Sequence, residues 1–144
     1  MVFVMLDVYA GAEAQAVIRK NGFLPDNFSA MLGASGGPKW FVLVGLDRVI
    51  VPEFLSRANN TIDIIGTSAG AIRAACLTQN VPKAAIHRLE HHYSRTTYSE
   101  KPTPTEISDS ARHILRVMLG EQGVSDILNN AQFKAHFITA RSKG

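Results

Sequence analysis

The most restrictive feature of this 144-residue sequence is the pentapeptide Gly66-Thr-Ser-Ala-Gly70, which has the pattern Gly-x-Ser-x-Gly. It follows the run Thr61–Ile65, in which four of the five side chains are β-branched, as is typical of a strand. Residues 69–79 then fit a helix. A serine between a strand and a helix must occupy a sharp turn, in which side chains two residues to either side would collide. The pattern therefore predicts a strained turn centred on Ser68, with glycine needed on both flanks.

A second glycine-containing stretch, Ser-Gly-Gly-Pro-Lys at 35–39, has a similar context. The apolar run 28–33 before it predicts a short buried strand, and the apolar pattern over 38–50 predicts a helix. The backbone amides of Gly36 and Gly37 can converge on an anion at such a place. A plain Gly–Gly turn stays an alternative, and the stretch matches neither the dinucleotide fingerprint nor the Walker A pattern.

The rest of the sequence predicts further helices and one more strand. We expect helices over residues 10–21, 82–95 and 107–119, a loop within the domain at 101–105, and a third strand within 133–140. Strands that alternate with helices predict an α/β fold with a parallel sheet. The length is that of one ordinary domain.

Together, the two motifs resemble those of the patatin-like phospholipase family. That family carries a Gly-Gly-Gly-x-Arg/Lys-Gly loop after its first core strand and then, at similar spacing, an elbow that often reads Gly-Thr-Ser-Ala-Gly. In this chain the Gly-rich loop spans residues 33–39 and the elbow spans residues 66–70. Ser35 and Trp40 replace the first and last glycines of the family loop, and Ala34 stands where an Asp often precedes it. The resemblance implies a three-layer α/β/α sheet, mostly parallel and C-terminally incomplete, with residues 1–144 forming a single partial domain.

The resemblance also implies a chemistry. Ser68 would be the nucleophile of a serine lipid acyl hydrolase, a phospholipase or esterase, and Gly36 and Gly37 would form its oxyanion hole. Gly66 and Gly70 would be the elbow glycines. Lys39 falls on the basic position of the family loop and would stabilise charge there. The substrate would be a lipid or another ester, and the mechanism would need neither a metal nor an organic cofactor.

The general base is the missing part of this pattern. The family uses a Ser–Asp dyad whose Asp usually comes from an Asp-Gly turn late in the domain, and this sequence contains no Asp-Gly pair. Asp63 is near Ser68 in the sequence but lies along the preceding strand, too far away at ~3.3 Å per residue to be the base. We therefore expect that the catalytic Asp lies outside this chain, which would be a fragment or a truncated product. A parallel sheet cut in this way has an open edge that invites self-association.

Two other interpretations stay open. One is an α/β-hydrolase esterase with a Ser-His-acid triad, in which the histidine comes last in the chain. His136 is late enough for that role but falls on an expected strand. The other is a non-catalytic patatin-like fragment that binds lipid or pairs with another chain.

The remaining residues with reactive or metal-binding side chains have simpler interpretations. His87, His91 and His92 are expected on a solvated helix face, because the zinc-protease pattern H-E-x-x-H is absent. The single cysteine, Cys76, is expected to be a buried packing residue. No metal site is expected.

Composition and charge limit the classes of partner that this chain is expected to bind. The net charge is +3 and no run of Lys or Arg exceeds two residues, so we expect no nucleic-acid binding, while a weak peripheral contact with an anionic membrane stays open. No stretch approaches the ~20 apolar residues of a membrane span. The apolar opening Met1–Leu6 lacks a basic n-region, so no signal peptide is expected. These observations favour a cytoplasmic protein.

Overall fold

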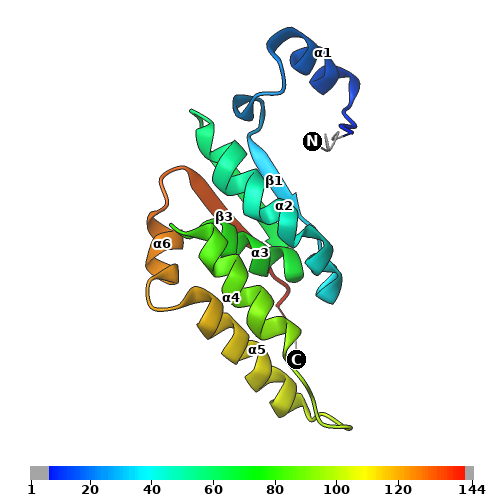
Figure 1. Cartoon of the computed structure of the whole chain (residues 1–144), viewed down its shortest axis with the longest axis vertical. Coiled ribbons are helices and arrows are strands. Elements are labelled where there is room, and N and C mark those ends of the chain that lie inside the picture. Colours follow the sequence, from blue (N-terminus) through cyan, green and yellow to red (C-terminus); the bar gives the residue numbers. More distant parts are fainter. Residues whose placement is uncertain (1–6, 142–144) are drawn as a thin grey trace, which may run out of the picture.

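The computed structural model describes residues 7–141, in which helices separate each strand from the next along the chain (Figure 1). They are α1 (Ala12–Asn21), β1 (Ala30–Gly33), α2 (Val44–Val49), β2 (Ile62–Thr67), α3 (Ala69–Leu77), α4 (Pro82–Ser94), α5 (Pro104–Leu119), α6 (Gly123–Asn129) and β3 (Phe133–Ile138). Short 3₁₀ turns occur at Pro25–Asn27, Gly37–Leu43 and Leu55–Arg57, and a π-helical turn at Ile50–Phe54. Residues 1–6, on which the signal-peptide expectation rests, lie outside the described range.

The strands of the described part form one parallel sheet in the order β1-β2-β3. Gly33 at the end of β1 lies opposite Gly66 in β2, and Thr67 at the end of β2 lies opposite Ile138 in β3. The predicted parallel α/β sheet is therefore confirmed. Because parallel strands end at the same edge, the loops that follow β1 and β2 leave the sheet side by side.

The helices cover one face of this sheet. Along β2 the burial alternates, with Ile62 and Ile64 essentially inaccessible and Asp63 and Ile65 half-buried. Leu32 and Ile138 point to the opposite face and are 75% and 61% exposed. Right-handed crossovers between strands that follow one another in order place every connecting helix on the same side. Within residues 7–141 there is accordingly one helical layer on the sheet, and its second face is uncovered.

The core lies between the sheet and the helices that cover it. Trp40 is 5% exposed and packs in this core, as its place in the apolar pattern predicts. Cys76 is fully buried, as expected, and burial raises the pKa of its thiol to about 12. A thiol with that pKa is protonated and unreactive at neutral pH. By contrast α1, at one end of the molecule in Figure 1, contributes no buried residue.

Two expectations about the helices were wrong. The segment predicted as one helix over 38–50 is a 3₁₀ turn followed by the short α2 and a π-helical turn that contains Pro52. Since proline cannot donate a main-chain hydrogen bond, the helical ladder changes its pattern there. The other error is α6, which the sequence analysis missed. Gly120, with φ 60°, ends α5, and Gly123 begins a new helix against the side chain of Gln79, where a Cβ would approach to 3.0 Å.

Candidate active site at the ends of two strands

Ser68 lies between the last residue of β2 and the first residue of α3, and its side chain is exposed. Its φ of 52° and ψ of −122° make it the only residue other than glycine with a positive φ among residues 7–141. Such a conformation costs an L-residue about 1–3 kcal/mol and is typical of functional sites. The predicted strained turn at Ser68 is therefore confirmed.

The flanking glycines are required by the same turn. A Cβ on Gly66 would lie 2.2 Å from the carbonyl oxygen of Gly70, and a Cβ on Gly70 would lie 2.0 Å from the carbonyl oxygen of Gly33. Real Cβ atoms do not approach a carbonyl oxygen so closely, because their van der Waals contact distance is far longer. The steric need for glycine at 66 and 70, predicted from the motif, is confirmed. The contact with Gly33 was not predicted, and it joins the elbow directly to the start of the Gly-rich loop.

The Gly-rich loop turns sharply at its two central glycines. Gly37 has a φ of 52°, a conformation that favours glycine, and Gly36 is exposed. Within residues 7–141, no hydrogen bond uses the N–H of either residue, whereas the next amide, that of Lys39, donates to the carbonyl oxygen of Gly36 at 3.2 Å. Two neighbouring amides are thus available to an acceptor. The Lys39 side chain is exposed and forms no ion pair within the described range.

A buried ion pair connects the helices that follow the two loops, and the sequence analysis missed it. Arg73 in α3 donates from Nε to Oδ2 of Asp47 at 2.7 Å and from Nη2 to Oδ1 at 2.5 Å. The two side chains are 8% and 1% exposed. A charged residue within the apolar helix 69–79 was the available signal, because such a residue needs a buried partner. No sequence pattern could identify Asp47 in α2 as that partner.

An apolar cavity opens one helical turn beyond Ser68. It has a volume of about 340 Å³ and is lined by side chains of α3, α5, α6 and β3, among them Ala71, Ile72, Leu119 and Phe137. Its lining is almost entirely apolar. The main-chain N–H groups of Ala71 and Ile72 donate to the carbonyl oxygen of Ser68, so the cavity wall and the elbow belong to the same helical turn.

The structure pairs His136 with Asp63. Nε2 of His136 lies 2.8 Å from Oδ1 of Asp63 across β2 and β3, on the uncovered face of the sheet. His136 lies opposite Ile65 in the register. Ile65 is three residues before Ser68, so His136 is displaced from Ser68 by roughly 10 Å along the strand direction. In the described part of the chain no side chain forms a hydrogen bond with Ser68 Oγ.

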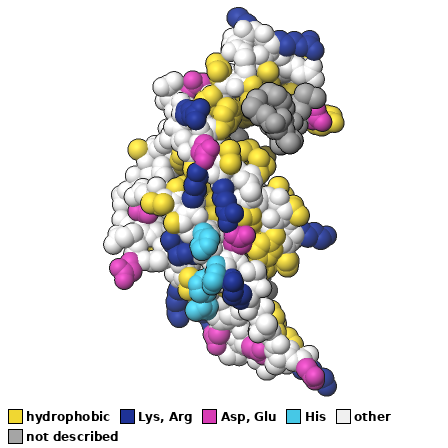
Figure 2. Space-filling model, in the orientation of Figure 1, with side chains coloured by type: hydrophobic (Ala, Val, Ile, Leu, Met, Phe, Trp, Pro, Cys, Tyr) yellow, Lys and Arg dark blue, Asp and Glu magenta, His cyan; other side chains and the backbone are white. Residues whose placement is uncertain are grey.

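The histidines of α4 gather at the surface on the face shown in Figure 2, with His87 and His91 exposed and His92 half-buried. The ring centroids of His87 and His91 are 6.1 Å apart, and His92 lies 5.6 Å from His113 of α5. Arg95 lies closest to the His91 ring and, as the largest influence, lowers the pKa of that side chain. No group of three or more His, Cys, Asp or Glu side chains in residues 7–141 has an arrangement that could hold a metal ion.

Comparison with protein-family models, with curated proteins and with solved structures finds no significant match. No helix within residues 7–141 has the length and apolar character needed to cross a membrane.

Proposed function

We propose that this chain carries the nucleophile and the oxyanion loop of a patatin-like serine acyl hydrolase that acts on a lipid ester. The observation that carries the proposal is the strained backbone of Ser68, held beside a loop with two unbonded glycine amides. The strain falls on an exposed serine, and strained residues of this kind cluster at functional sites. The two loops are also neighbours, because Gly33 and Gly66 are paired in the sheet.

In the proposed reaction, Ser68 Oγ forms a bond to the carbonyl carbon of the ester while its proton passes to a general base. The negative charge that develops on the carbonyl oxygen is stabilised by the N–H groups of Gly36 and Gly37, and each such donor is worth about 3 kcal/mol in comparable sites. The bond to the alcohol then breaks, with the alcohol taking up the proton. Water hydrolyses the resulting acyl-enzyme by the same steps.

The apolar cavity supports an acyl chain as the substrate group next to the scissile carbonyl. Its wall begins in the helical turn that starts at Ser68, and its lining offers no polar group to a sugar or peptide. Burial of each methylene in such a place contributes about 0.8 kcal/mol. A fatty acyl ester therefore fits better than a short polar one.

The proposal includes a three-layer architecture and a base that residues 7–141 do not supply. A second layer of helices would cover Leu32 and Ile138 on the exposed face of the sheet. The base would be an Asp, as the resemblance to the patatin-like family implies. The exposed edges of β1 and β3 would otherwise favour self-association.

A fluorophosphonate probe tests the nucleophile. It forms a covalent bond to an activated serine with loss of fluoride, and the modified residue is then identified by peptide mass spectrometry. We expect slow labelling at Ser68 that is absent in Ser68→Ala. Ser35, an exposed serine in the neighbouring loop, is the matched control, and Ser35→Ala should label like the parent. Labelling of Ser68 no faster than that of Ser35 would contradict the proposal.

One observation favours a second candidate, a non-catalytic lipid-binding protein. Within residues 7–141 no side chain is hydrogen-bonded to Ser68 Oγ. No described side chain is therefore in place to take the proton of Ser68. In that case a fluorescent fatty acid should bind the apolar cavity while the phosphonate leaves Ser68 unmodified. Leu119→Trp, which fills the cavity, should remove the fatty-acid binding.

A further inference from the structure

The buried pair Asp47–Arg73 connects α2 to α3. The proposed chemistry requires the loops that precede these two helices to keep a fixed position relative to each other. Arg73 lies in the second turn of α3, the helix that begins directly after Ser68. Asp47 lies in α2, which continues the helical segment that begins at Gly37. Each partner therefore lies in the helix that follows one of the two loops of the candidate site.

The geometry of the pair fixes orientation as well as distance. Two parallel hydrogen bonds, of 2.7 and 2.5 Å, join the guanidinium edge to both carboxylate oxygens. A bidentate fork of this kind resists rotation about the bond direction, which a single lysine contact does not. Among the ion pairs of residues 7–141, this is the one that joins α2 to α3.

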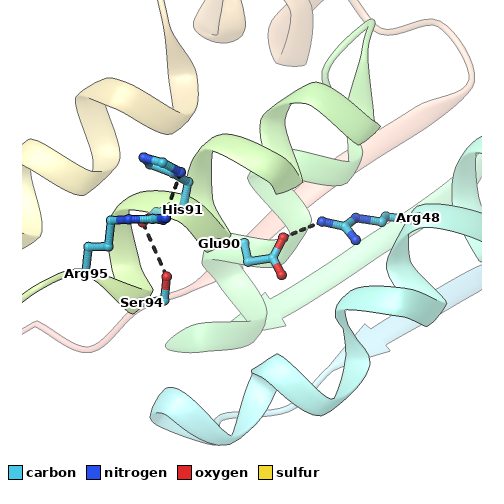
Figure 3. A network of polar contacts seen from close by, with 5 residues as sticks. All are labelled: Arg48, Glu90, His91, Ser94 and Arg95. Carbon is cyan, nitrogen blue, oxygen red and sulfur yellow. Dashed lines mark hydrogen bonds and ion pairs between the residues drawn. The ribbon is translucent and has the colours of Figure 1, made fainter.

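The residue after Asp47 joins α2 to a different helix. Arg48 forms an ion pair with Glu90 of α4, and Figure 3 shows these two side chains reaching toward each other from neighbouring helices. The side chains of this pair are 40% and 35% exposed, whereas Asp47 and Arg73 are almost completely buried. The pair Asp47–Arg73 is thus the one of the two that is shielded from water, and it joins the helices that follow the two loops of the candidate site.

Stability alone does not account for a buried ion pair. The desolvation of two charges offsets most of their attraction, and apolar residues of similar volume are often as stable. A buried fork does, however, permit few alternative arrangements of the helices that carry it. Catalysis is sensitive to such arrangements, since a displacement of ~1 Å of a positioned group can lower a rate about 10²-fold.

We propose that Asp47 and Arg73 are positioning residues, which set the Gly36 and Gly37 amides relative to Ser68. The role rests on the proposed function, because it has meaning only if Ser68 is the nucleophile and the two amides bind the oxyanion. Arg73 acts through α3 and Asp47 acts through α2, and neither side chain touches the substrate.

Phenylboronic acid is a suitable probe because its binding is measured at equilibrium. A general base would change how fast the adduct forms, and the measured affinity does not depend on that rate. Ser68 Oγ forms a bond to the trigonal boron, the hydroxyl proton passes to the buffer, and the boron becomes a tetrahedral anion with an oxygen in the oxyanion position. Boron-11 NMR distinguishes the trigonal from the tetrahedral species. The parent chain should form the tetrahedral adduct and Ser68→Ala should not. Equal signals from both proteins would overturn the proposed function and the positioning role with it.

Arg73→Lys is the decisive variant, since it keeps the charge and loses the fork. We expect its boronate affinity, corrected for the folded fraction measured by circular dichroism, to fall by about tenfold to a hundredfold. The matched control is Arg88→Lys. Arg88 donates to the carbonyl oxygen of Met118 at 2.8 Å, far from both loops in the chain, so its replacement should lower stability without changing the affinity.

The double variant Asp47→Leu/Arg73→Met covers the case in which Arg73→Lys does not fold. It replaces the pair by apolar side chains that suit a buried site, and we expect a folded protein with weakened boronate binding. Parental affinity in either folded variant, while Ser68→Ala still fails to bind, would overturn the positioning role and leave the proposed function intact. If neither variant folds, the pair is a requirement of folding alone, which also overturns the proposal.

Discussion

The Cα of Gly70, in the first turn of α3, packs so closely on the end of β1 that a Cβ there would lie 2.0 Å from the carbonyl oxygen of Gly33. The same Cβ would lie 2.9 Å from the carbonyl oxygen of Ala34. The elbow and the Gly-rich loop are therefore in direct main-chain contact. The position of Gly36 and Gly37 relative to Ser68 therefore depends on the close approach of Gly70 to Gly33.

Gly70→Ala should consequently destabilise the protein severely. The added methyl group cannot fit without moving α3 away from β1, and we expect a loss of at least about 3 kcal/mol in the free energy of unfolding, measured with urea. Gly45→Ala is the matched control, because Gly45 is exposed in α2 and a Cβ there would meet nothing within 4 Å. Alanine at that position should stabilise the protein by up to about 1 kcal/mol. Similar effects of the two changes would argue against the close contact.

Ser68→Gly should raise stability while it removes the nucleophile. Glycine adopts a φ of 52° and a ψ of −122° without the penalty that serine carries, so we expect a gain of about 1 kcal/mol in thermal or urea unfolding. Ser68→Ala keeps the Cβ and the strain, and its stability should be close to that of the parent. Equal stabilities of the glycine and alanine variants would mean that the turn at position 68 is not strained.

The buried ion pair should behave as a coupled unit in unfolding experiments. Asp47→Ala leaves the Arg73 guanidinium buried without a partner, and the expected loss is about 3–5 kcal/mol in the free energy of unfolding. The double change Asp47→Leu/Arg73→Met removes both charges and should recover most of that loss. If the double variant is as unstable as Asp47→Ala, the loss in Asp47→Ala does not come from an unpaired buried charge, which would contradict this prediction.

Much of the site could be predicted from the sequence, because the elbow is determined locally. The β-branched residues of β2, the glycines at 66 and 70 and the helix after Ser68 follow from steric rules that act over a few residues. The partner contacts could not be predicted in this way. Gly33 meets Gly70 only because β1 and β2 are adjacent in the sheet, and Asp47 finds Arg73 only through the packing of α2 on α3.

The helix predictions failed at two places, the glycines that follow α5 and the apolar segment that follows Pro38. Gly120 and Gly123 were interpreted as the end of a helix, and they also allow the next one, α6, to begin. The apolar spacing after Pro38 was interpreted as a regular α-helix, although the same spacing occurs in the mixed 3₁₀ and α turns that the chain adopts. A hydrophobic period detects a buried face and does not distinguish these ladders.

Residues 1–144 alone should hydrolyse esters at a rate close to that of buffer. Positioned general-base help is worth roughly 10²–10⁴ in rate, and no described residue is bonded to Ser68 Oγ to provide it. The measurement is the hydrolysis of a short p-nitrophenyl ester by the parent and by Ser68→Ala. Robust turnover that disappears in Ser68→Ala would show that a base is present within the chain, and Asp63, His136 and Lys39 would be the first residues to replace.

The central claim is that Ser68 and the amides of Gly36 and Gly37 act on the same carbonyl group. A crystal structure of the chain with a phosphonate bound covalently to Ser68 tests it most directly, since the phosphoryl oxygen takes the place of the oxyanion. The account predicts that this oxygen lies about 3 Å from the nitrogen of at least one of the two glycines. A phosphoryl oxygen that points to solvent, with both amides bonded within their own loop, would contradict the account.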